Sequence, residues 1–165
     1  MNEKIQLIEY SNEEEVLLHL IKQFWIAHND YTQTVEESLE DLRAWTGFNH
    51  KVFLIEKSGV YIGVVHLGSR GGELDWIEDL FVLPEYQGNG YGSIAIRLTE
   101  DIVKKYSESI YLEVAARNLN ALKLYHRQGY NCLNTITIRK DFEPENFNTI
   151  RNENLLGYPF EVRKK

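Results

Sequence analysis

A short segment in the middle of the chain combines alternating glycines with the start of a predicted helix. It reads Gln87-Gly88-Asn89-Gly90-Tyr91-Gly92-Ser93 and follows a strand-like apolar run from Trp76 to Val82. Glycines let the backbone bend so that several N–H groups point into one concavity, and a helix that begins there adds its free amides and positive dipole end. The first helical turn, residues 93 to 97, has no Asp or Glu, although carboxylates are favoured there. The segment therefore predicts a site for an anion such as a pyrophosphate.

Two common phosphate-binding loops do not match this spacing. A P-loop ends in Gly-Lys-Ser/Thr, whereas Gly92 is followed by Ser93 and Ile94, with no lysine to meet the outer phosphates. A dinucleotide fingerprint needs a glycine at position 93 and an acid about 20 residues further on. Glu113 lies at roughly that distance, but position 93 is serine, so this match is partial and weak. The spacing argues against a nucleoside triphosphatase and gives little support to a nucleotide-binding oxidoreductase.

Two motifs in this sequence resemble those of the GCN5-related N-acetyltransferase (GNAT) family. Residues 87 to 92 fit the family pattern Gln/Arg-x-x-Gly-x-Gly/Ala, with Gln87 where arginine is commoner. The second pattern, Asn-x-x-Ala-x-x-x-Tyr-x-x-x-Gly-Phe/Tyr, is matched by Asn118, Ala121, Tyr125, Gly129 and Tyr130. Two motifs in order at the right separation make a strong signal, and the resemblance covers residues 52 to 138 well.

The resemblance implies that acetyl-CoA is the co-substrate and says which residues hold it. Its pyrophosphate would lie on residues 87 to 93. Backbone groups of Leu80, Phe81 and Val82 would pair with the pantetheine arm like an added strand. Asn118 precedes a short predicted helix and could cap it, and the resemblance implies that it also hydrogen-bonds the cofactor arm.

Glu78 is the candidate for the base that amine acetylation needs. A primary amine is mostly protonated near neutral pH, and it cannot attack a carbonyl carbon until it loses a proton. The strand from Trp76 to Val82 also looks like the corresponding strand of polyamine acetyltransferases, in which the residue matching Glu78 lies at the acceptor amine. Because side chains alternate along a strand, Glu78 and Leu80 would share one face, and Asp79 would lie on the other unless a bulge intervenes. The alternative is that Glu78 is an exposed or salt-bridged strand residue.

Tyr125 matches the tyrosine that, by the resemblance, gives a proton or a hydrogen bond to the leaving CoA thiolate. A phenol of pKa about 10 and a thiol of about 8.5 make this transfer modestly uphill, which is feasible when the two groups are held together. The alternative is a helix aromatic that packs on the sheet. Asp79 is assigned to structural hydrogen bonding and His66 is a weak candidate for lining the acceptor site, so the contribution of either to that site stays open.

The predicted elements alternate between strands and helices. Strand patterns are found at residues 4–10, 52–56, 61–67, 76–82 and 110–114, with two further strands at 130–134 and 136–140. Helical spacing of apolar residues predicts helices that end near Ala27, Trp45, Tyr106 and Gln128. Ser11 to Glu14 has the pattern of a capping box for the first helix, and the tail from residue 141 to 165 is left unassigned.

Composition narrows the class of protein. With 165 residues, 43% hydrophobic and 26% charged, the chain has the size and balance of one ordinary globular domain. A formal net charge of −7 argues against a nucleic-acid partner and weakly favours cationic ligands. The acidic residues of the second predicted helix are interpreted as a solvated helix face in preference to a rim that attracts substrate. One cysteine, Cys132, excludes an internal disulfide, and the five histidines show no metal-site spacing. No apolar run could span a membrane or act as a signal peptide, so a cytoplasmic protein is expected.

We therefore expect a single N-acetyltransferase domain over residues 1 to 165. The fold class is α/β (α+β), with a mixed, largely antiparallel sheet and helices on both faces. The expected activity is transfer of acetyl from acetyl-CoA, without a metal, to a primary amine of a small cationic acceptor such as a polyamine or an aminoglycoside. The alternatives are a non-catalytic acyl-CoA-binding regulatory domain, against which Glu78 and Tyr125 argue, and an acetyltransferase of protein or peptide amines. Dimers are frequent among small members of the resembled family, and the oligomeric state is left open.

Overall fold

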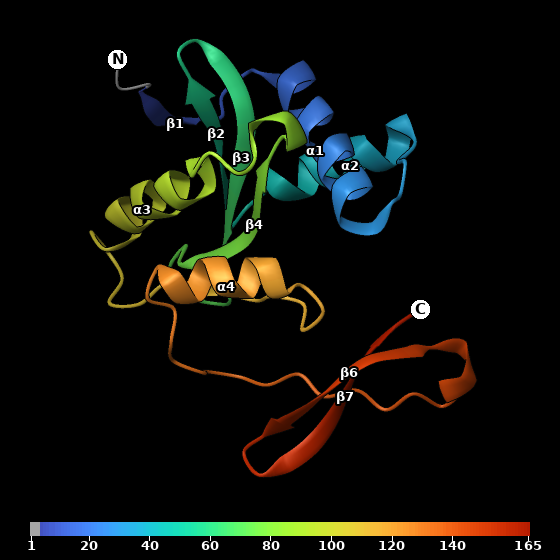
Figure 1. Ribbon diagram of the computed structural model, residues 1–165. Coiled ribbons are helices and arrows are strands. Elements are labelled where there is room, and N and C mark those ends of the chain that lie inside the picture. The colour runs from blue at the N-terminus through green and yellow to red at the C-terminus, as the bar shows by residue number, and fades with distance from the viewer. Residues whose placement is uncertain (1–3) are drawn as a thin grey trace. The chain divides into compact units, whose positions relative to one another are not determined.

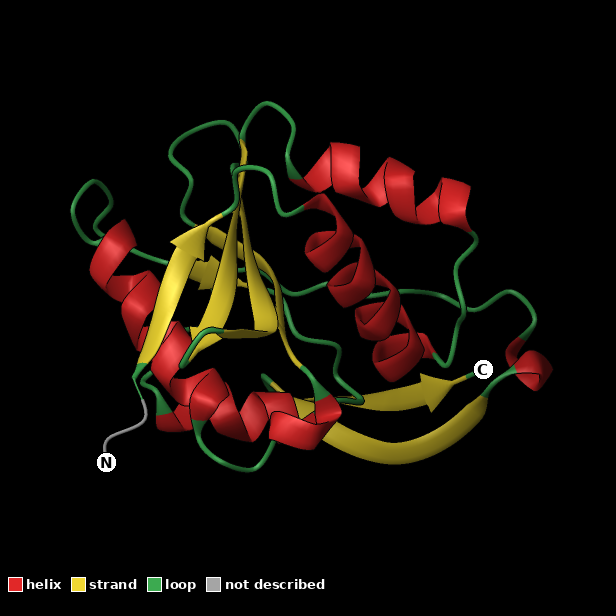
Figure 2. Ribbon diagram, turned by 90° about the horizontal axis from the view of Figure 1, so that it is seen from above, coloured by secondary structure: helices red, strands yellow, loops and turns green. Residues whose placement is uncertain are grey.

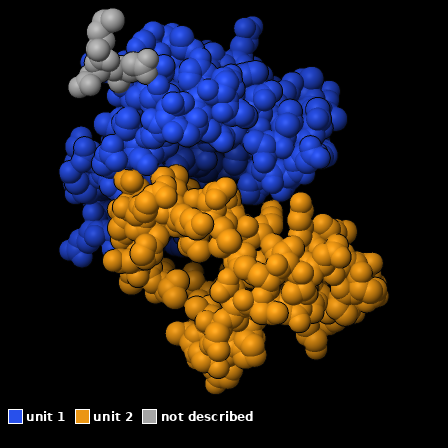
Figure 3. Space-filling model, in the orientation of Figure 1, with its two compact units in different colours: residues 1–113 blue, residues 114–165 orange. Residues whose placement is uncertain are grey.

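The computed structural model describes residues 4 to 165 (Figure 1). The chain divides into two compact units, of which the first ends at Glu113 and the second begins at Val114 (Figure 3). No helix among the described residues is both long and apolar enough to cross a membrane.

The first unit is built on a five-stranded sheet whose strands follow one another in chain order. The strands are β1 (Ile5–Glu9), β2 (His50–Lys57), β3 (Val60–Gly68), β4 (Trp76–Val82) and β5 (Tyr111–Leu112). The first four pair antiparallel, and only β4 and β5 run parallel. The predicted mixed, largely antiparallel sheet is therefore confirmed.

Helices cover both faces of this sheet (Figure 2). In Figure 1, α1 (Glu14–Asn29) and α2 (Val35–Trp45) lie on one side of it and α3 (Tyr91–Val103) on the other. Side chains alternate along β2, so Val52 and Leu54 enter the core beneath α1 and α2, and Phe53 and Ile55 enter the core beneath α3. We call these the α1–α2 core and the α3 core.

The capping box predicted at Ser11 to Glu14 is wrong. Helix α1 begins at Glu14, so Ser11 lies outside it, and the Glu13 carboxylate instead accepts hydrogen bonds from the backbone amides of Ser11 and Asn12. A true capping box starts α2, where Thr34 Oγ1 accepts from the amide of Glu37 and the Glu37 carboxylate accepts from the amide of Thr34.

The second unit contains the short helix α4 (Leu119–Arg127) and a hairpin of β6 (Asn148–Leu155) and β7 (Tyr158–Lys164). The strands predicted at 130–134 and 136–140 are wrong, because residues 130 to 141 form no regular secondary structure. Alternating apolar residues there satisfy strand propensity, but propensity supplies no pairing partner. Within residues 141 to 165, β6 and β7 instead pair with each other through the turn at Leu156 and Gly157.

At Gly63 the backbone of β4 leaves no room for a side chain on β3. A Cβ atom at this position would lie 2.2 Å from the carbonyl oxygen of Phe81 and 3.0 Å from the Cα of Val82. We expect Gly63→Ala to lower the free energy of unfolding by about 1–3 kcal/mol, because backbone must move to admit the methyl group. Gly72→Ala is the matched control, since a Cβ there meets nothing within 4 Å. Urea unfolding that gave equal stabilities for the two variants would contradict this packing.

Candidate active site

The glycine segment forms the junction between β4 and α3. Gly88 and Gly90 have left-handed φ angles of 78° and 81°, and a Cβ on either would meet nothing within 4 Å, so the space beside them is open. The Gln87 side chain donates to the carbonyl of Val82 at 2.7 Å, and the Asn89 side chain donates to the carbonyls of Tyr86 and Gln87. These two side chains thus fix the loop, which leaves backbone groups to face a ligand.

Helix α3 begins beside this loop with Gly90 as its N-cap and no acidic residue in its first turn. A glycine cap has no side chain to accept from the first amides of the helix, and the dipole favours negative charge at this end. The junction therefore fits a pyrophosphate bound through main-chain amides.

The outer edge of β4 is paired over only part of its length. Trp76 and Ile77 pair with β5, whereas within residues 4–165 no strand pairs with that edge from Glu78 to Val82. The backbone of Leu80, Phe81 and Val82, predicted to pair with the pantetheine arm, lies on this stretch. Unpaired strand edges accept an added strand, so this edge fits that ligand.

A β-bulge interrupts β4 at Glu78. His66 pairs with Asp79 and Leu67 with Ile77, so Glu78 has no residue directly opposite it on β3. The bulge resets the alternation: Ile77 packs in the α3 core with Leu80 and Val82. The prediction that Glu78 shares a face with Leu80 is therefore wrong.

Glu78 and Asp79 instead lie on the same face of the sheet. The Glu78 side chain occupies the space where a Cβ of Gly68 would lie, and the Asp79 carboxylate contacts His66, two residues earlier on β3. Residues two apart on a strand share a face, so both carboxylates are on the α1–α2 side.

Arg70 holds Glu78 in place. Its Nε and Nη2 donate to the two carboxylate oxygens of Glu78 at 3.3 and 3.1 Å, and its Nη1 lies 3.2 Å from Glu113. The guanidinium also stacks over the Trp76 ring at 4.2 Å. The hydrogen bonds to Glu78 hold the pKa of Arg70 above its ordinary value. Glu78 is thus a salt-bridged residue in this state, and its carboxylate faces a cation.

Three more titratable side chains join across β2, β3 and β4. Asp79 Oδ2 lies 2.8 Å from Nδ1 of His66, and Nε2 of His66 lies 2.8 Å from Nδ1 of His50. The Trp45 ring stacks on buried His66 with centroids 4.8 Å apart. Sequence reasoning singled out Asp79 and His66 but missed His50, which only the strand register brings to His66.

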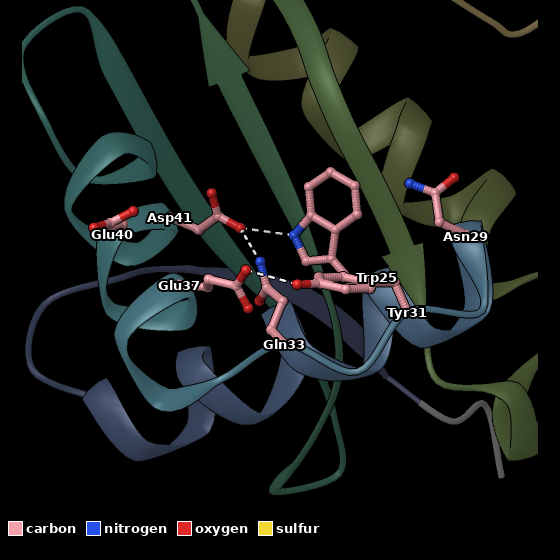
Figure 4. A pocket seen from close by; sticks show the side chains of 7 residues that line it. All are labelled: Trp25, Asn29, Tyr31, Gln33, Glu37, Glu40 and Asp41. Carbon is pink, nitrogen blue, oxygen red and sulfur yellow. Dashed lines mark hydrogen bonds between the residues drawn. The ribbon is translucent and has the colours of Figure 1, made fainter.

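A pocket of about 520 Å³ lies between the end of α1 and the start of α2 (Figure 4). Its lining contains three carboxylates, two aromatic rings and no basic side chain, namely Trp25, Asn29, Tyr31, Gln33, Glu37, Glu40 and Asp41. Asp41 accepts from Trp25 Nε1 at 2.7 Å and from Gln33 at 2.6 Å. The Tyr31 hydroxyl donates to Glu37, which holds the pKa of that carboxyl below its ordinary value. The acidic face of α2 thus lines a pocket with the charge that a cation requires.

Tyr125 and Asn118 belong to the second unit. Asn118 Oδ1 accepts from the amide of Ala121 at 3.1 Å, so the predicted N-cap of α4 is confirmed. The ring of Tyr125 meets that of Tyr130 edge-on, with centroids 5.8 Å apart. Their catalytic and cofactor-binding roles stay predictions. Among residues 4 to 165, no group of three or more His, Cys, Asp or Glu is arranged to hold a metal ion.

Comparison with known proteins gives the family. The model of the acetyltransferase (GNAT) family matches residues 16–130, which is more than half of the chain. The chain therefore belongs to the GNAT acetyltransferase family, as the two motifs predicted, and it is an N-acetyltransferase. No curated protein matches the sequence.

Solved structures of low sequence identity share the fold. An aminoglycoside acetyltransferase, meta-AAC0020, from an uncultured soil metagenomic sample in complex with sisomicin is 16% identical, with a TM-score of 0.65 over 83% of this chain and 95% of that one. The aminoglycoside N-acetyltransferase AAC(6')-Iy in complex with CoA is 16% identical, with a TM-score of 0.63 over 86% and 97%. The integron cassette protein HFX_CASS3 from a salt-marsh metagenome is also 16% identical, with a TM-score of 0.63 over 85% and 91%.

Gly90 gives a direct test of the glycine segment. We expect Gly90→Val to weaken CoA binding at least about tenfold, or about 1.4 kcal/mol, because valine disfavours a φ of 81° and would fill the open space beside the helix end. Gly157→Val is the control, because Gly157 has a φ of 85° and lies in the turn of the β6–β7 hairpin. Calorimetry on a folded Gly90→Val protein with undiminished CoA affinity would refute the site.

Proposed function

We propose that this acetyltransferase moves an acetyl group from acetyl-CoA to a primary amine of a small cationic acceptor, of the polyamine or aminoglycoside-like kind. The observation that carries the proposal is the open glycine junction before α3, at the position of the family's first motif. The complexes of the two similar aminoglycoside acetyltransferases with CoA and with sisomicin support a cofactor and an acceptor of these classes.

Acetyl-CoA would bind along the end of β4 and the start of α3. The amides of residues 88 to 93 would hold its pyrophosphate, which needs no lysine because the amides and the helix dipole supply the positive potential. The unpaired edge at Leu80, Phe81 and Val82 would bind the pantetheine arm through its main chain, and Asn118 would hydrogen-bond the same arm.

Glu78 would take the proton of the acceptor ammonium, and Tyr125 would protonate the departing thiolate. The ion pair with Arg70 supports the first role, because both oxygens of the Glu78 carboxylate already accept hydrogen bonds from a cationic group. An acceptor ammonium would replace the guanidinium at that carboxylate. The bulge places Asp79 on the same face, where its hydrogen bond to His66 fits a supporting role.

The charge of the protein supports a cationic acceptor. The net charge is −7, and the pocket at α1 and α2 has three carboxylates and two aromatic rings in its lining. Ammonium groups are attracted to carboxylates and to aromatic faces alike. A lysine-rich peptide would also satisfy this charge, so a lysine peptide has to be compared with the small amines. The single cysteine fits the cytoplasm, where thiols stay reduced.

Tyr125→Phe tests the role of the phenol. Turnover should fall by about tenfold to a hundredfold or more, because general acid catalysis contributes about 10²–10⁴ and water can replace part of it. The dissociation constant for acetyl-CoA should stay unchanged, since the hydroxyl acts only while the sulfur gains charge. Tyr158→Phe, at an exposed tyrosine of β7, is the matched control. Equal turnover numbers for the two variants would refute the acid role of Tyr125 and favour the alternative that its ring only packs.

The acceptor class is tested with spermidine, an aminoglycoside, a lysine peptide and a neutral amino-acid amide. We expect kcat/KM to be highest for the small multiply charged amines and to fall with rising ionic strength, because salt screens the attraction to the carboxylates. Glu78→Gln should lose most of kcat/KM at neutral pH. Preference for the neutral amide, without salt dependence and without loss in Glu78→Gln, would refute both the acceptor class and the base.

A further inference from the structure

The hydrogen-bonded chain of Asp79, His66 and His50 contains two titratable groups that the proposed reaction does not use. It crosses three neighbouring strands on the α1–α2 side of the sheet. His66 pairs with Asp79 on β4 and with Val52 on β2, and His50 shares a face with Val52 because it lies two residues before it. His66 is only 4% exposed, and the Trp45 ring covers it. A buried imidazole that is hydrogen-bonded to a half-buried one is costly as mere packing, since each buried ring nitrogen needs a partner of the right kind.

The chemistry of the chain assigns a tautomer to each ring. An ionised Asp79 only accepts hydrogen bonds, so Nδ1 of His66 must carry the proton that it donates. Neutral His66 then has its lone pair on Nε2, which accepts from a proton on Nδ1 of His50. The remaining lone pair of the chain is on Nε2 of His50, and that atom has no hydrogen-bond partner among residues 4 to 165. The chain therefore ends in an available base.

Glu78 lies beside this end of the chain. Its side chain lies over Gly68, and Gly68 is the residue of β3 directly opposite His50 on β2. The negative charges of Glu78 and Asp79 act on His50 in the direction that raises its pKa, while burial and neighbouring His66 act more strongly and hold that pKa below its ordinary value of about 6.5. His50 is thus neutral and ready to accept a proton at pH 7.

We propose that His50, supported by His66 and Asp79, is a relay base that takes over the proton which Glu78 removes from the acceptor ammonium. The inference rests on the proposed function. An imidazole is ordinarily a stronger base than a carboxylate, so Nε2 of His50 can accept the proton of the Glu78 carboxyl, directly or through one water. Proton transfer restores the Glu78 carboxylate, and the imidazolium of His50 keeps donating through Nδ1 to His66, which Asp79 orients.

The proton balance of the reaction is complete with this relay. The ammonium loses one proton to Glu78 and then to His50, and the freed amine nitrogen bonds to the acetyl carbon. As the carbon–sulfur bond breaks, Tyr125 protonates the departing thiolate, and the second proton on nitrogen passes through water to the Tyr125 phenolate and restores the phenol. His50 later releases its proton to solvent. His50 receives its proton from Glu78 and does not act on the substrate directly, so His66 and Asp79 are positioning residues for it.

The test is the pH profile of His50→Asn, which keeps a donor toward His66 but has no base at the position of Nε2. The groups that face His50 are His66 on β3, Glu78 and Asp79 on β4, and Arg70 through its pair with Glu78. For the native enzyme we expect turnover to fall as pH drops through a value below 6.5, where His50 becomes protonated. His50→Asn should lose about a hundredfold in turnover at pH 7. Its acidic limb should move to lower pH, while His19→Asn, at an exposed site on α1, keeps the native profile.

A double-mutant cycle with Glu78→Gln checks that the two groups act in sequence. Once Glu78 is replaced, no proton enters the chain, so adding His50→Asn should cost much less than it does in the native background. Additive losses would overturn the relay, as would an unchanged pH profile in His50→Asn. A native enzyme that acetylates no amine would overturn the proposed function itself, and the relay with it.

Nitrogen-detected NMR of labelled histidines gives a readout apart from activity. Both His50 and His66 should show the Nδ1–H tautomer at neutral pH. The Nε2–H form at His50 would overturn the assignment, whatever the enzyme acetylates.

Discussion

Strand β4 has to satisfy two different neighbours, and the rest of the candidate site depends on how it does so. One edge pairs with β3 along the strand, while the other meets β5 only at Trp76 and Ile77. Among residues 4 to 165, the strand therefore begins as an inner strand and ends with one edge that no other strand pairs. Buried main-chain groups need hydrogen-bond partners, so such an edge is either covered or used. A cofactor arm that pairs like a strand satisfies the same groups.

The bulge at Glu78 lies just where the pairing of β4 with β5 ends. One extra residue turns two consecutive carboxylates to the same face and returns Leu80 and Val82 to the α3 core. Without it, Glu78 would point to the opposite side from Asp79, and Gly68 would have no reason to lack a side chain. Apolar packing beyond the bulge and carboxylate chemistry at it are thus two consequences of one register shift.

In the first unit, main-chain groups supply the positive potential of the candidate site and carboxylate side chains supply its negative potential. Positive potential beside Gly90 comes from a helix end and main-chain amides, which cannot titrate and which a β4–α3 junction places by backbone geometry alone. Negative potential at Glu78 and at the α1–α2 pocket comes from side chains that an ammonium can meet directly. An acidic protein can in this way bind a polyanion without a patch of lysines.

Local chemistry made the glycine segment, the cap at Asn118 and the order of strands and helices predictable from the sequence. These features depend on residues that are neighbours in the chain: a glycine permits its own φ, and an asparagine caps the amide three residues on. Reasoning from chain neighbours alone also predicted the first capping box wrongly, because Ser11 is a suitable capping residue but the helix begins only at Glu14. The same reasoning predicted strands after residue 130, because apolar residues alternate there. Residues 130 to 141 form none, since alternation does not supply a partner strand.

Only the tertiary structure decided the bulge, the ion pair of Arg70 with Glu78 and the junction of His50 with His66. Each joins residues on different strands or loops, and a shift of one residue in register would turn every one of these side chains to the other face. The sequence by itself determined the family, the glycine-rich junction before α3 and the presence of a carboxylate on β4. The direction of that carboxylate, and the bases beside it, followed from strand pairing between segments far apart in the chain, which no local pattern encodes.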